Sequence, residues 1–152
     1  MNDCGVCQRI EETKRGENPY FVRELETGYV VLGDIQRIKG YTLFLCKQCH
    51  SELHHLDPAY RKKFLWEMSL VAEAVDKAFK PDKLNYELLG VGKGIHMHWH
   101  IFPRRAGDIP TLGPVWKIGD ELKSEEYRPR KEELEEMKSA LNVALDEVLS
   151  LN

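Results

Sequence analysis

The stretch His96-Met97-His98-Trp99-His100-Ile101-Phe102-Pro103-Arg104 carries a histidine at every second position of its first half. Side chains of a β-strand alternate between the two faces of its sheet, so this spacing predicts three imidazoles on one face. Met97, Trp99 and Ile101 would then form an apolar opposite face that can be buried against a core. Imidazole is well suited to nucleophilic, proton-transfer and metal chemistry near neutral pH. Half of the six histidines of the chain fall here, which favours a functional strand over a polar face that merely contains histidine.

The composition sets broad limits on the rest of the chain. A length of 152 residues fits a single domain with a sizeable core, and 42% hydrophobic residues with a net charge of −3 are ordinary for a globular protein. The charge balance argues against a dedicated nucleic-acid binder, and no apolar run is long enough for a membrane span. The N-terminus lacks a signal segment, so we expect a cytoplasmic protein with reduced cysteines.

Periodicity and turn signals predict an α+β fold with a five-stranded, largely antiparallel sheet, one main helix and an extra C-terminal helix. The predicted strands span residues 20–25, 29–33, 41–45, 84–89 and 96–102. Asp57 and Pro58 predict the start of the main helix, which Pro81 ends. We expect a core over residues 1–110, with an N-terminal zinc-binding segment, and a C-terminal extension over residues 111–152 that is irregular before its helix near Pro129.

The histidine stretch resembles the signature of the histidine triad (HIT) family, His-x-His-x-His-x-x with apolar x, often followed by Pro-Arg. Residues 105–108, Arg-Ala-Gly-Asp, continue as in dinucleoside-polyphosphate hydrolases of that family. Residues 40–47, Gly-Tyr-Thr-Leu-Phe-Leu-Cys-Lys, resemble its usual Gly-His-Thr-Leu-Val-Ile-Pro-Lys segment. The resemblance extends over roughly residues 4–108 and implies the HIT fold.

The resemblance implies a role for each histidine. His98, the middle one, would attack the α-phosphorus of a nucleotide and form a nucleotidyl-histidine intermediate. His100 would contact a phosphate oxygen or the departing group, and His96 completes the triad. Asn85 lies eleven residues before His96, where the family places a residue that contacts ribose or phosphate.

The chain departs from the family pattern at several positions. Gly92 stands where a Gln is usual, in a Gly-rich loop over residues 90–94 whose backbone and Lys93 could bind an anion. Tyr41 replaces a usual His. Gly33 aligns with the ribose-binding Asp of the family, and Asp34, one position later, is our predicted ribose contact. The one-residue offset slightly favours the alternative, a plain loop aspartate.

Two CxxC pairs, Cys4–Cys7 and Cys46–Cys49, have the spacing of zinc ligands. By themselves the two pairs suggest either a zinc site with four cysteine ligands or four free thiols. Zinc-containing HIT proteins use an N-terminal CxxC, a later His and the first triad histidine. The resemblance therefore implies a structural zinc ion bound by Cys4, Cys7, Cys49 and His96, with Cys46 as the alternative ligand.

Together these features predict a nucleotide hydrolase or nucleotidyl transferase that acts at the α-phosphate of dinucleoside polyphosphates or nucleoside phosphoramidates. A divalent cation is compatible with polyphosphate substrates. The resemblance implies a homodimer formed through the main helix and a shared sheet edge. The charge balance and the lack of a long apolar run predict no nucleic-acid polymer or membrane as partner. The alternative is a zinc-stabilised nucleotide-binding or sensing module without turnover, which the loss of the usual Gln at position 92 favours.

Overall fold

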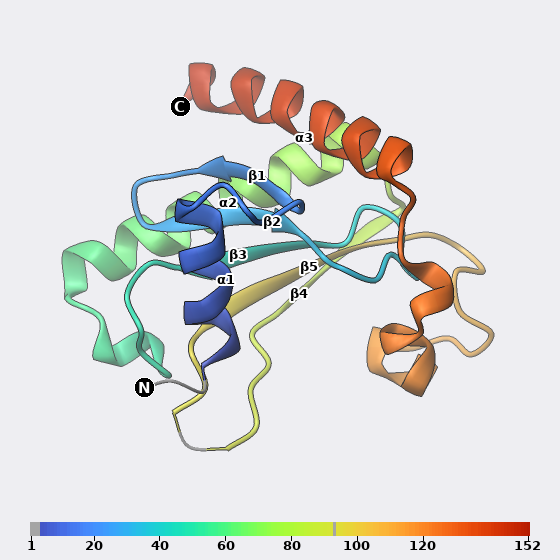
Figure 1. The fold of residues 1–152 in the computed structure, drawn as a ribbon, viewed down its shortest axis with the longest axis horizontal. Helices are drawn as coiled ribbons and strands as arrows, with labels where there is room; N and C mark the ends of the chain where they lie inside the picture. Colours follow the sequence, from blue (N-terminus) through green and yellow to red (C-terminus); the bar gives the residue numbers. More distant parts are fainter. Residues whose placement is uncertain (1–3, 93) are drawn as a thin grey trace.

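The computed structural model describes residues 4–92 and 94–152, and their centre is one five-stranded antiparallel sheet (Figure 1). Its strand order is β1-β2-β3-β5-β4, so β1 and β4 are the edge strands. The strands are β1 (Phe21–Glu24), β2 (Gly28–Leu32), β3 (Thr42–Cys46), β4 (Lys83–Glu87) and β5 (His98–Arg104). The predicted α+β class and antiparallel sheet are confirmed.

Three α-helices flank the sheet, namely α1 (Gly5–Lys14), α2 (Pro58–Phe79) and α3 (Lys131–Leu151). Helix α2 begins as predicted, because the Asp57 carboxylate accepts hydrogen bonds from the backbone N–H groups of Ala59 and Tyr60 at its N-terminus. It ends at Lys80, which adopts the left-handed conformation ahead of Pro81. Short 3-10 segments lie at Leu53–His55, Val115–Lys123 and Glu125–Tyr127.

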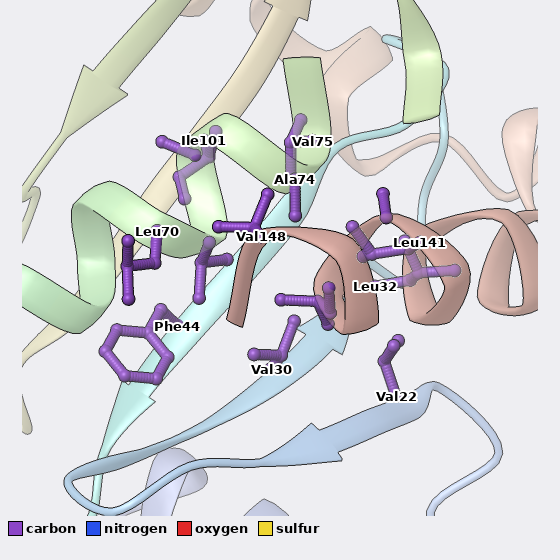
Figure 2. Packing of buried hydrophobic residues seen from close by; sticks show 14 of the residues in the cluster. Val22, Val30, Leu32, Phe44, Leu70, Ala74, Val75, Ile101, Leu141 and Val148 are labelled. Carbon is purple, nitrogen blue, oxygen red and sulfur yellow. The ribbon is translucent and has the colours of Figure 1, made fainter. Parts of the chain in front are cut away.

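Helices α2 and α3 lie together on one face of the sheet, and α1 lies on the other (Figure 1). The main core is the layer between the sheet and the helix pair, where Val30, Phe44 and Ile101 meet Val75 and Leu141 (Figure 2). Helix α3 therefore forms part of the main core and is more than an appended element.

Helix α1 is a finding that the sequence did not predict, because its apolar face consists of little more than Val6 and Ile10. These two side chains pack on the outer face of the sheet, against Tyr29 and Leu45. At the other end of that face, the 3-10 segment Val115–Lys123 packs on Phe102. His98 and His100 lie between these two covered regions and remain half-buried.

The observed start of β5 corrects the predicted strand over residues 96–102. Strand β5 begins at His98, whereas residues 96 and 97 run beside the turn that follows β3, where the Met97 N–H donates to the carbonyl of His50 at 2.8 Å. His96 therefore does not share the strand with the other two histidines. Within the described residues, no helix is long and apolar enough to cross a bilayer.

Candidate functional site

His98 is the first residue of β5, and its ring is held by the backbone. Its Nδ1 lies 2.9 Å from the carbonyl oxygen of His96. A carbonyl oxygen only accepts hydrogen bonds, so Nδ1 carries the proton and the neutral ring has its lone pair at Nε2. This is the tautomer that a nucleophilic histidine requires.

His100 lies next to His98 on the same face, with 4.6 Å between the ring centroids. Its Nδ1 lies 2.6 Å from the hydroxyl of Tyr41, and its ring is parallel to those of Tyr41 and Phe102. Burial, together with the neighbouring His98, lowers the pKa of His100 to about 4. His100 is therefore a neutral imidazole near neutral pH.

Tyr41 depends on the absence of a side chain at Gly33. A Cβ atom at Gly33 would overlap the ring of Tyr41, which stacks on Phe102 with 4.1 Å between centroids. Burial, with smaller contributions from Asp34 and Glu87, raises the pKa of the Tyr41 hydroxyl. The departures from the family pattern at Gly33 and Tyr41 are therefore physically coupled, since the glycine makes the space that the tyrosine fills.

The structure brings together the four residues that we expected to bind zinc. Single ligand atoms of Cys4, Cys7, Cys49 and His96 all lie within 4.8 Å of one another. Nε2 of His96 lies 2.7 Å from the carbonyl oxygen of Cys46, so Nε2 carries the proton and Nδ1 presents its lone pair to the cluster, 3.3 Å from Cys7 Sγ. Cys46 itself is fully buried in the main core and contributes no ligand atom to the cluster.

The thiol chemistry of the cluster suits a cation. Burial and the nearby thiols of Cys4 and Cys49 raise the pKa of Cys7 to about 12. Burial acts in the same direction on Cys4, but hydrogen bonds from the Cys7 backbone and side chain outweigh it and lower the pKa of Cys4. Three crowded sulfur atoms and one oriented imidazole nitrogen form the donor set of a tetrahedral Cys3His zinc site.

Three of the four predicted substrate contacts are described by the structure, and none of them contacts the histidine pair directly. Asp34 makes a bidentate ion pair with Arg9 of α1, with contacts of 2.9 and 2.7 Å. Gly92 is exposed and lines a small cavity with Met97 on its wall. Lys93 lies outside the described residues.

The third, Asn85, is paired within the protein. It lies opposite Phe102 in the β4–β5 ladder, and its amide oxygen accepts a hydrogen bond of 2.9 Å from Arg104. The Arg104 guanidinium also makes a bidentate ion pair with Asp108, at 2.6 and 2.8 Å.

Glu87 is a residue of this region that the sequence reasoning missed. It lies directly opposite His100 in the β4–β5 ladder, two residues beyond Asn85, and so shares a face with the histidine. Its Oε2 atom is buried without a hydrogen-bond partner among the described residues. Burial raises its pKa, and Arg104 opposes this only in part.

A groove of about 1020 Å³ runs along β4, between this edge strand and the residues that follow β5. Asn85, Glu87 and Arg104 line it, and so does Trp116, whose side chain is 53% exposed. An exposed aromatic ring on the wall of a groove is able to stack on a planar ligand.

The sequence model of the HIT domain family matches residues 16–107, which is more than half of the chain. The chain belongs to the HIT family. Members of this family are in general nucleotide hydrolases and transferases, and some of them do not catalyse a reaction. The comparison with curated proteins gives no match.

Solved HIT structures share the fold. A histidine triad protein from Bradyrhizobium japonicum is 25% identical, with a TM-score of 0.71 over 82% of this chain and 89% of that one. A HIT protein from Sinorhizobium meliloti is also 25% identical, with a TM-score of 0.69 over 86% and 91%. A zinc-bound histidine triad family protein from Mycobacterium smegmatis is 20% identical, with a TM-score of 0.68 over 99% and 98%.

Proposed function

We propose that this HIT protein is a nucleotide hydrolase or nucleotidyl transferase that acts at the α-phosphate of dinucleoside polyphosphates or nucleoside phosphoramidates. The hydrogen bond from His98 Nδ1 to the His96 carbonyl carries the proposal, because it leaves the lone pair of Nε2 available for attack on phosphorus. Water or another acceptor then releases the nucleoside monophosphate from His98.

His100 would assist as a hydrogen-bond donor. Burial raises the pKa of Tyr41, so its hydroxyl stays protonated and can donate to Nδ1 of His100. That tautomer places the other ring proton on Nε2, which can then bind a non-bridging phosphoryl oxygen as charge develops in the transition state. A neutral donor stabilises this charge without requiring low pH.

Zinc would bind to Cys4, Cys7, Cys49 and His96, and four protein ligands would make the site structural. This set would fasten the N-terminus of α1 and the backbone of His96, which in turn orients His98. Metal analysis tests the assignment: Cys49→Ser should lose the stoichiometric zinc of the wild type, whereas Cys46→Ser should retain it. A metal-free wild type, or loss of zinc from Cys46→Ser alone, would overturn the assignment.

The predicted substrate contacts are part of the same proposal. A change of KM without a change of kcat in variants of Asn85, Gly92, Lys93 or Asp34 would mark a ground-state contact. A divalent cation would accompany only the polyphosphate substrates.

We propose a homodimer as the assembly. Strand β4 is an edge strand, and its Tyr86 side chain is 47% exposed. Such an edge presents unpaired backbone groups to a second strand. Light scattering on the purified protein tests this, and a monomer over the micromolar range contradicts it.

Activity is tested by incubating the protein with diadenosine tetraphosphate and with adenosine 5′-phosphoramidate. We expect AMP from at least one substrate with the wild type and none above background with His98→Ala. The matched control is His54→Ala, which removes an exposed histidine outside the site and should leave the rate unchanged. Tight nucleotide binding without AMP release would instead support the binding or sensing module.

A further inference from the structure

The register between β4 and β5 brings a carboxyl group to the histidine pair. Residues directly opposite each other in an antiparallel ladder have Cβ atoms about 4.5–5.5 Å apart, which is the relation of Glu87 to His100. The diagonal neighbour on β5 is His98, at roughly 7–8 Å. That distance leaves room for a phosphoryl group between the nucleophile and the carboxyl group.

The Glu87 carboxyl group has no partner that would occupy it in the resting protein. Its Oε2 atom is buried and makes no hydrogen bond among the described residues. The nearest strong cation, Arg104, is already engaged by Asp108 and Asn85. Leaving a buried polar atom unpaired is costly, so an unpaired atom beside a reactive histidine pair calls for an explanation, and a catalytic role is one.

The surrounding charges do not suit a polyphosphate chain at this position. The Arg105 guanidinium lines the groove but is engaged by the protein, because it donates to the backbone carbonyls of Lys39, Phe79 and Pro103. Lys83, the remaining cation among the described lining residues, lies four residues from Glu87, or about 13 Å along the strand. The cations of the groove are therefore either engaged within the protein, as Arg104 and Arg105 are, or distant from Glu87, as Lys83 is.

We propose that Glu87 is a further catalytic residue that protonates the departing group, and that it selects amine leaving groups over polyphosphates. The proposal rests on the proposed function of His98. His98 Nε2 forms a bond to the α-phosphorus while the P–N bond breaks, and the electron pair of that bond passes to nitrogen. The proton of the Glu87 carboxyl group moves to the same nitrogen, which gives a neutral amine and a Glu87 carboxylate.

His100 is less suited to this proton transfer. With its pKa near 4 it is neutral at physiological pH, and a neutral imidazole is a weak acid. Burial raises the pKa of Glu87, which favours the protonated carboxyl group relative to an exposed glutamate. The groups that face Glu87 are His100 and Tyr41 on one side and Arg104 on the other, of which only Arg104 opposes the shift.

The test compares leaving groups that do and do not need a proton. Single-turnover rates are measured for adenosine 5′-phosphoramidate, which releases ammonia, and for the p-nitrophenyl ester of AMP, which releases a stable anion. In Glu87→Gln the rate with the phosphoramidate should fall about 100-fold or more, the usual contribution of a general acid. The burst of nitrophenolate should change by less than about threefold.

Glu73→Gln is the matched control, since it makes the same glutamate-to-glutamine change at an exposed position of α2, outside the groove. It should leave the rates with both AMP derivatives unaffected. Equal losses on both AMP derivatives in Glu87→Gln, or no loss on either, would overturn the role of Glu87 and leave the proposed function intact. A wild type that cleaves none of the substrates would overturn both.

Discussion

Tyr41 departs from the family pattern, and its hydroxyl contacts His100 of the candidate site. The substitution Tyr41→Phe removes only this hydroxyl. The variant keeps the ring, which stacks on Phe102 and fills the space above Gly33. What it loses is the 2.6 Å hydrogen bond to Nδ1 of His100. Any effect is then due to the hydroxyl and not to a cavity.

The expected effect on stability follows from that single bond. Leaving a buried acceptor unpaired costs about 1–3 kcal/mol, so we expect the free energy of unfolding to fall by that amount in urea titrations at pH 7. Ser150→Ala is the control, because it removes an exposed hydroxyl near the end of α3, away from the site. Surface changes of this kind usually stay within about 0.5 kcal/mol.

Catalysis should fall as well. Without the Tyr41 hydroxyl the two tautomers of His100 compete, and the fraction that presents Nε2–H to the phosphoryl group decreases. We expect the single-turnover rate to fall roughly 10-fold, about 1.4 kcal/mol of barrier, and equally for the phosphoramidate and the nitrophenyl ester. An unchanged rate together with an unchanged free energy of unfolding would refute the role assigned to Tyr41.

Three further predictions follow from the packing and the charges. Gly33→Ala should destabilise the protein by about 1–3 kcal/mol and reduce activity, because the new methyl group displaces the ring of Tyr41; a crystal structure with an unmoved ring would contradict this. Leu141→Ala, a fully buried position of α3, should cost about 2–5 kcal/mol in urea unfolding, and a loss below 1 kcal/mol would mean that α3 is peripheral. The native pKa of His100, about 4, lies below its ordinary 6.5, so the neutral ring stabilises the fold fully above pH 6.5. This contribution, at most about 3 kcal/mol, is lost as the pH falls toward 4, and His100→Asn should show a correspondingly flatter pH dependence of unfolding.

The alternation of residues 98–102 was enough to predict a strand with a chemical face and an apolar face, because a period of two needs no knowledge of the neighbouring strands. The same holds for α2, whose start and end are encoded locally by Asp57 and Pro81. His96 was placed on that strand wrongly, since the hydrogen bond from Met97 to His50 pulls the preceding residues out of the ladder.

Contacts set by the pairing of strands lay beyond such local reasoning. Counting back from His96 singled out Asn85, whereas the register places Glu87 opposite His100. The path of the loop between β4 and β5 decides which residue of β4 faces His100. This path cannot be predicted from the periodicity of the sequence. The contact between Gly33, just after β2, and Tyr41, just before β3, could likewise not be deduced from either residue alone.

The grouping of Cys4, Cys7, Cys49 and His96 was predicted from the resemblance and is present in the structure. The CxxC spacing alone would have allowed Cys46 an equal claim. What separates the two cysteines is the side of the sheet: Cys46 is the last residue of β3 and points into the main core, whereas Cys49 follows the turn and reaches the N-terminal pair. Helix α1, the element that carries this pair, was missed because two apolar residues give too weak a periodic signal.

The central claim is that His98 attacks phosphorus and holds the nucleotide covalently. It is tested most directly by quenching the reaction with the p-nitrophenyl ester of AMP within one turnover and locating the adduct by mass spectrometry of the digested protein. We predict an adenylyl group on the peptide that contains His98, assigned to that residue, absent from His98→Ala and present in His54→Ala. Release of nitrophenolate without any adduct, or an adduct on another residue, would contradict the account.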